Sequence, residues 1–271
     1  MAKPTNLFSS LTLSLLCAVG MGVPAVSLAD TMLEFRNHGI AAGEAAPSSV
    51  SVYVTEDFVR INEQADNWTL YDRVADTVYV VDETRREYTP LDRQSIAALS
   101  VKMQAARDEM QQQLQKMTPE QRAMIEQMVG HPIELQPEEV SYQSTGDRKT
   151  VNGYDCSVGR LVAGGETREE FCTAQPRAIG MSGEEYQAVR SMYSLMAALQ
   201  KASGFGGGMP SYDQLDGIPI EIRSRDGSTQ VISRASHGDV DTRLFRVPEG
   251  FSRVSPSGTA EAAQGASKTL R

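Results

Sequence analysis

Two cysteines in the second half of the chain, Cys156 and Cys172, are the residues whose spacing most directly suggests chemistry. They lie in runs with strand character on either side of Gly164-Gly165, a dipeptide typical of hairpin turns. Both cysteines are eight residues from Gly164, so a three-residue loop places them opposite each other, within the Cα–Cα range of a disulfide. The pattern therefore predicts a disulfide. The alternative, two free thiols in a metal or redox site, lacks CxxC spacing and neighbouring histidines.

Residues suited to catalysis or metal binding do not form a recognisable pattern. The three histidines, His38, His131 and His237, have no partners at metal-ligand spacing. The chain also lacks the GxSxG, HExxH and GK[ST] signatures of hydrolases, metalloproteases and phosphate loops. We therefore expect a protein that is not an enzyme and uses no cofactor or metal, the alternative being a hydrolase whose triad is not visible in one sequence.

Methionines form the second informative pattern. Met103, Met110 and Met117 recur every seven residues and so fall on nearly one face of a helix. Because methionine is flexible and polarizable, it occurs at adaptable apolar binding surfaces, although an ordinary core is the other interpretation. The candidate ligand-facing or core residues are Ile96, Leu99, Met103, Met110, Leu114, Met117, Met124, Met128, Val189, Met192, Met196 and Leu199.

The first 29 residues have the parts of a secretory signal peptide: a basic start at Lys3, an apolar run, and small residues at Ser27 and Ala29. An uncleaved N-terminal anchor is the alternative, but the apolar run is short for a membrane span of about 20 residues. We predict cleavage after Ala29, a periplasmic location, and no membrane-spanning segment in the mature chain. Export also favours the disulfide, because disulfides persist in oxidising compartments.

The charge balance narrows the choice of partners. Lys3 is the only charged residue among 1–29, so cleavage changes the formal net charge from −9 to −10. An acidic chain lacks the basic footprint that nucleic acid or an anionic membrane surface requires. The length of the mature chain suits one domain, 30–254, and the low-complexity composition of 255–271 predicts a disordered tail.

The elements that must position these residues alternate in blocks along the chain. Short runs rich in β-branched and aromatic residues predict strands within 31–91, 135–174 and 218–247, the last block including 218–222, 230–233 and 243–247. Helix formers predict helices over 92–116, 118–130 and 183–203, with caps at Thr118 and Ser182. Segregated blocks of this kind predict an α+β fold, an antiparallel sheet with helices on one face.

Several segments together carry a resemblance to a known family. They are Phe58-Val59-Arg60-Ile61, Val78 to Asp82 followed by Glu87-Tyr88, Met117 to Arg122, Lys149 to Cys156, and Phe245 to Phe251. Over about 31–254 the chain resembles the periplasmic lipoprotein-carrier (LolA/LolB-like) superfamily and, more closely, a poorly characterised periplasmic domain family with the same layout. The resemblance implies a strongly curved antiparallel sheet, an incomplete barrel, with helices covering the concave face. In the carriers, the enclosed cavity holds lipid acyl chains and there are no catalytic residues.

Two functional hypotheses follow. The first is a non-enzymatic periplasmic binding protein, carrier- or chaperone-like, that holds an apolar ligand such as a lipid or a lipidated chain between the sheet and the helices. The second is a protein-interaction or sensory module of the envelope with a filled interior. A continuous apolar cavity above about 300 Å³ favours the first hypothesis. A filled interior with an exposed apolar patch favours the second.

Overall fold

The computed structural model describes residues 30–39, 49–63, 66–121, 124, 140–203 and 212–256. The predicted signal peptide lies outside these residues, as do Met128, most of the predicted helix 118–130 and nearly all of the predicted tail 255–271.

The elements follow one another in the predicted blocks. The first block comprises β1 (Thr31–His38), β2 (Ser49–Val54), β3 (Phe58–Asn62), β4 (Asn67–Asp72), β5 (Thr77–Asp82), β6 (Glu87–Asp92) and α1 (Arg93–Lys116). The second comprises β7 (Val140–Val151), β8 (Tyr154–Ala163), β9 (Glu166–Ala174), the short helix η1 (Pro176–Ile179) and α3 (Gly183–Ser203). The third comprises η2 (Tyr212–Gln214), β10 (Ile218–Ser224), β11 (Thr229–His237), η3 (Thr242–Phe245) and β12 (Ser252–Arg253).

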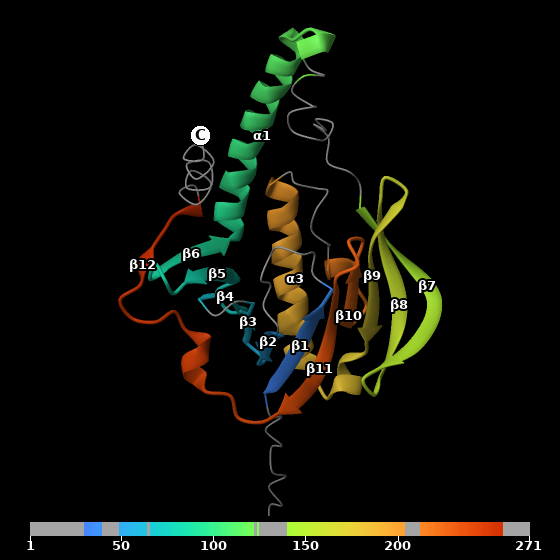
Figure 1. Ribbon diagram of the computed structural model, residues 1–271. Coiled ribbons are helices and arrows are strands. Elements are labelled where there is room, and N and C mark those ends of the chain that lie inside the picture. The colour runs from blue at the N-terminus through green and yellow to red at the C-terminus, as the bar shows by residue number, and fades with distance from the viewer. Residues whose placement is uncertain are drawn as a thin grey trace, which may run out of the picture.

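All of the described strands join one sheet of 12 strands in the order β12-β6-β5-β4-β3-β2-β1-β11-β10-β9-β8-β7. Neighbours are antiparallel except β12 and β6, which are parallel. The sheet curves strongly, and its edge strands β12 and β7 are not paired with each other (Figure 1). The predicted α+β fold with a strongly curved, incomplete barrel is confirmed.

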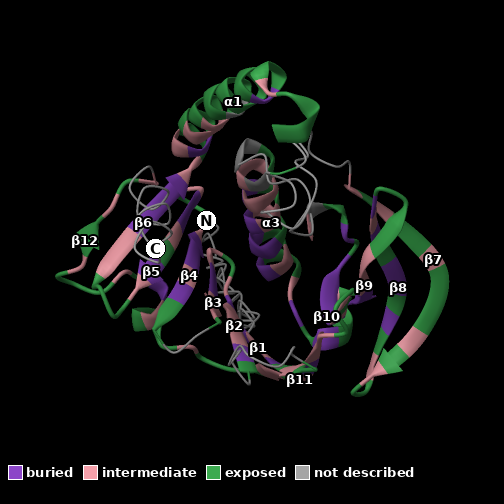
Figure 2. Ribbon diagram, turned by 45° about the horizontal axis from the view of Figure 1, so that its top comes forward, coloured by how far each residue is buried: buried purple, intermediate pink, exposed green. Residues whose placement is uncertain are grey.

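Helix α3 lies against the concave face of the sheet, and the parts of the strands that surround it are largely buried (Figure 2). The main core joins Ala188, Val189 and Leu195 of α3 to the inner faces of the strands. Helix α1 instead packs beside α3 and runs on past the sheet, so most of its surface is exposed (Figure 1). The concave face is therefore covered mainly by one helix, with the second lying alongside it.

The start of α3 carries the predicted capping box. The Ser182 backbone N–H donates to Glu185 Oε2 at 2.7 Å, and the Glu185 N–H donates to Ser182 Oγ at 3.1 Å. The other oxygen of the same carboxylate, Oε1, accepts the backbone N–H of Thr31 at 2.8 Å. Because Glu185 and Thr31 are both buried, this group links the first residue of β1 to the start of α3.

The segment 243–247, predicted as a strand, contains instead the end of the 3₁₀ helix η3, so that prediction is wrong. The reason is packing on the outer face of the sheet. The Phe245 ring stacks on Phe58 with centroids 5.5 Å apart, and Arg60 Nη1 donates to the carbonyl of Leu244 at 2.8 Å. These contacts stabilise a helical turn that covers a second, smaller apolar cluster around Trp68.

The disulfide between Cys156 and Cys172 is present, with Cα atoms 5.3 Å apart, but the hairpin differs from the predicted one. Ala163 pairs with Glu166, so the loop is the two residues Gly164 and Gly165, both at positive φ, rather than three. A bulge then shifts the register again, and Cys172 lies opposite Val158. The two cysteines are therefore diagonal neighbours, which the sheet geometry brings within disulfide range.

Candidate functional site

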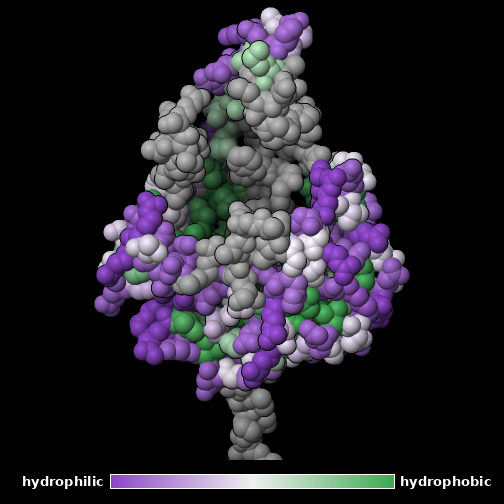
Figure 3. Space-filling model, viewed as in Figure 1, coloured by the Kyte–Doolittle hydropathy of each residue, from purple (hydrophilic) through white to green (hydrophobic). Residues whose placement is uncertain are grey.

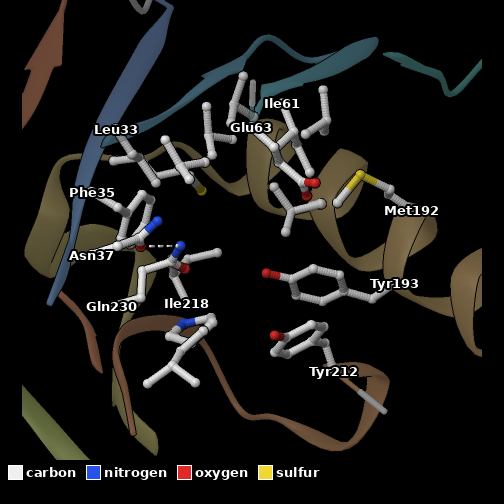
Figure 4. Close-up of a pocket in the computed structure, with 18 residues that line it drawn as sticks. Leu33, Phe35, Asn37, Ile61, Glu63, Met192, Tyr193, Tyr212, Ile218 and Gln230 are labelled. Atoms are coloured by element: carbon white, nitrogen blue, oxygen red, sulfur yellow. Dashed lines mark hydrogen bonds between the residues drawn. The ribbon is translucent and has the colours of Figure 1, made fainter. Parts of the chain in front are cut away.

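A cavity of about 350 Å³ lies between the concave face of the sheet and α3. In Figure 3, hydrophobic side chains gather in a hollow between α1 and the sheet. Most of the residues that line the cavity are apolar, and they come from the strands as well as from α3 (Figure 4). The lining consists of Leu33, Phe35, Asn37, Val50, Val52, Val54, Val59, Ile61, Glu63, Met181, Val189, Met192, Tyr193, Tyr212, Ile218, Pro219, Ile222 and Gln230.

The alternation of strand residues builds the sheet wall of the cavity. Val50, Val52 and Val54 point to the same side of β2 because successive strand side chains point to opposite faces. The register places Val52 between Leu33 of β1 and Ile61 of β3, and all three line the cavity. This strand, which lies in the predicted block 31–91, is therefore one wall of the site.

The opposite wall is α3, which presents Val189, Met192 and Tyr193 to the cavity. Residues one turn apart lie on the same face of a helix, so this set follows from the helical period. Met181, between η1 and α3, adds a further apolar side chain to the lining.

Polar side chains collect at one end of this otherwise apolar space. Asn37 of β1 pairs in register with Gln230 of β11, and Gln230 Nε2 donates to Asn37 Oδ1 at 3.0 Å. Glu63 follows the last residue of β3, at the same end of neighbouring strands. The hydroxyls of Tyr193 and Tyr212 point into the cavity from the opposite side (Figure 4).

Burial raises the pKa of both cavity tyrosines and so reinforces their neutral form. Desolvation raises the pKa of Tyr193, and the nearby Tyr186 raises it further. Desolvation also raises the pKa of Tyr212, with Glu169, Tyr193 and Glu63 adding to the rise. Both phenols are therefore neutral hydrogen-bond donors at any physiological pH.

The predicted candidate residues have different positions relative to the cavity. Val189 and Met192 line it. Ile96 is buried in the main core, and Met196 and Leu199 pack against that core half-buried. Leu114 is buried, while Leu99, Met103 and Met117 are half-buried on or just after α1. None of these five α1-side residues, Ile96, Leu99, Met103, Leu114 and Met117, lines the cavity.

Met110 and Met124 are exposed, at 52% and 65%, so neither faces a core or the cavity in the described part of the chain. Met110 is exposed because α1 continues past the sheet. A seven-residue repeat predicts which face of a helix is apolar, but not how far along the helix a packing surface extends. The sequence-based reasoning also missed most of the sheet wall, such as Leu33, Phe35 and Ile61. The alternation Leu33, Phe35, Asn37 is the signal that indicates these positions.

Comparison with known proteins adds little to this geometry. No protein-family model matches the chain, and no curated protein matches it. Among solved structures, PNGF-II in two crystal forms gives TM-scores of 0.44 and 0.45 at 8% and 6% identity, covering 86% of this chain and 32% of that one. This chain thus spans about a third of the length of PNGF-II.

A third solved structure is the lipoprotein LppX of Mycobacterium tuberculosis, with a TM-score of 0.26 and 13% identity over 79% of this chain and 90% of LppX. TM-scores this low support no inference about function. The resemblance to the lipoprotein carriers therefore stays a prediction.

The described residues were also compared with the requirements of a membrane span and of a metal site. None of their helices is long and apolar enough to cross a membrane. No group of three or more His, Cys, Asp or Glu side chains among them is placed to hold a metal ion. His237, the last residue of β11, has its Nδ1 3.3 Å from the hydroxyl oxygen of Thr31.

Proposed function

We propose that this chain is a non-enzymatic, carrier-like protein of the periplasm that holds an apolar ligand, such as a lipid or a lipidated chain, between the sheet and α3. The observation that carries the proposal is the cavity of about 350 Å³ with apolar walls. Its volume falls within the range of ligand-binding sites, about 300–1,000 Å³, at the lower end. A site of this size suits a single hydrocarbon chain or one small apolar molecule.

The physical reason for binding is the hydrophobic effect. Val52, Ile61 and Met192 line a space that an apolar ligand would fill, and moving such a ligand from water stabilises the complex by about 25 cal/mol per Å² of buried apolar surface. The alternative, an interaction module with a filled interior, receives no support from this cavity. The disulfide is in keeping with an oxidising compartment, and so with export.

Native mass spectrometry of protein purified from the periplasm tests the proposal directly. A co-purifying apolar molecule, released on unfolding, is the expected result. Binding of a fluorescent fatty-chain probe by the delipidated protein should follow. Clean apo protein that also fails to bind such probes contradicts the proposal.

A cavity-filling substitution gives a sharper prediction. Val52→Phe adds a ring to the middle of the sheet wall and should weaken binding of a fluorescent fatty-chain probe at least tenfold, because it occupies the space that the chain needs. Titration of probe fluorescence measures the loss.

The matched control is Val80→Phe, the same change at an exposed position of β5 outside the cavity. This variant should bind the probe as the unmodified protein does. If circular dichroism shows that both variants are folded and both bind the probe equally well, the ligand does not bind in this cavity.

A further inference from the structure

The polar end of the cavity contains hydrogen-bonding groups that the protein leaves unpaired. Neither the Tyr193 hydroxyl nor the Tyr212 hydroxyl has a hydrogen-bond partner within the described part of the chain, and both point into the cavity (Figure 4). The two rings contact each other, with centroids 5.3 Å apart. Both tyrosines are half-buried, so a ligand atom that accepts from these hydroxyls would take the place of the water that otherwise satisfies them.

The charge around these hydroxyls is negative. Glu63 lines the same cavity, and Glu169 lies near enough to Tyr212 to raise the pKa of its phenol. Glu169 Oε1 accepts weakly from Ser224 Oγ at 3.5 Å, whereas its buried Oε2 has no partner. A negative charge that a ligand brought to this end would therefore be repelled.

The lining of the cavity supplies no positive charge that would offset Glu63 and Glu169. None of the residues that line the cavity is Lys, Arg or His. A site that binds a carboxylate or a phosphate normally supplies Arg, Lys or a set of backbone N–H groups.

We propose that the ligand is a single-chain amphiphile with an uncharged polar head, whose hydroxyl, ester or amide oxygen accepts hydrogen bonds from Tyr193 and Tyr212 while its chain occupies the apolar part of the cavity. The inference rests on the proposed carrier function and adds the class of head group. It excludes fatty acids in their ionised form and lipids with a phosphate head as preferred ligands.

Competition binding with three amphiphiles of identical alkyl chain tests this class. A fatty alcohol, its monoacylglycerol counterpart and the ionised fatty acid each displace a fluorescent fatty-chain probe at pH 8. The two uncharged compounds should bind at least tenfold more tightly than the carboxylate. Glu63→Gln should narrow this difference by improving carboxylate binding, because it removes one negative charge from the polar end.

The tyrosines are tested by the double variant Tyr193→Phe/Tyr212→Phe, which keeps the rings and removes the hydroxyls. It should bind the uncharged amphiphiles about tenfold more weakly, while a plain hydrocarbon of the same chain length binds unchanged. The matched control is Tyr186→Phe on the same helix, whose hydroxyl is buried but does not line the cavity. Tyr186→Phe should leave the preference for uncharged amphiphiles over the ionised fatty acid unchanged.

The outcomes separate the two proposals. If none of the amphiphiles or the hydrocarbon binds, the carrier function itself is wrong. If the carboxylate binds as tightly as the uncharged compounds, or if the double tyrosine variant retains full affinity for them, the apolar site stands and the head-group inference is overturned.

Discussion

Replacement of both Cys156 and Cys172 by alanine is expected to lower the free energy of unfolding by about 3 kcal/mol. The disulfide closes a loop with a sequence separation of 16, and such a cross-link stabilises the fold by about this amount by restricting the unfolded chain. Both residues are also almost fully buried in the main core. Denaturant unfolding, monitored by circular dichroism with and without reductant, measures the difference.

The reductant supplies the internal control for this prediction. Reduction should shift the unfolding midpoint of the unmodified protein close to that of the double alanine variant, and should leave that variant unchanged. Alkylation of both thiols in denaturant without prior reduction would show that the bond does not form, and would contradict the prediction.

The second large effect is expected at Glu185, whose carboxylate joins the first residue of β1 to the start of α3. Glu185→Ala removes the acceptor from the buried Thr31 N–H, at a cost of about 1–3 kcal/mol, and from the half-buried Ser182 N–H, at a smaller cost because water can reach it. Since partial rearrangement can satisfy one of them, we expect a total loss of about 2–4 kcal/mol. Glu185→Gln keeps one acceptor oxygen and should lose about half as much.

Glu184→Ala is the matched control, because it removes a carboxylate from the same first turn at an exposed position. Its effect should stay below about 1 kcal/mol, the size of a helix-dipole contribution. The same denaturant unfolding experiment compares all three variants. If Glu185→Ala costs no more than Glu184→Ala, the buried carboxylate does not hold β1 to α3.

Local patterns were sufficient for most of the elements. The strands within 31–91, the helix ending at Lys116 and the helix cap at Ser182 all have the predicted positions. These features depend on contacts within a few residues, such as strand alternation, helix propensity and hydrogen bonds to the first turn. Such contacts are visible in the sequence itself.

The errors arose where distant contacts decide the structure. Segment 243–247 contains the end of a 3₁₀ helix because Phe245 packs on Phe58, far away in the sequence. The Cys156–Cys172 hairpin has a shifted register because its loop is shorter and β9 carries a bulge. Met110 shares a helical face with Met103 but is exposed, because α1 extends past the sheet.

The sequence by itself determined the α+β character of this protein, its pair of bonded cysteines and the apolar faces of its strands and helices. Each of these follows from residue type and spacing over short stretches. Only the tertiary structure decided which faces surround the cavity, and that Tyr193, Tyr212 and Glu63 meet at one end of it. Tyr212 and Glu63 come from segments about 150 residues apart in the sequence, and only the curvature of the sheet around α3 brings such segments together.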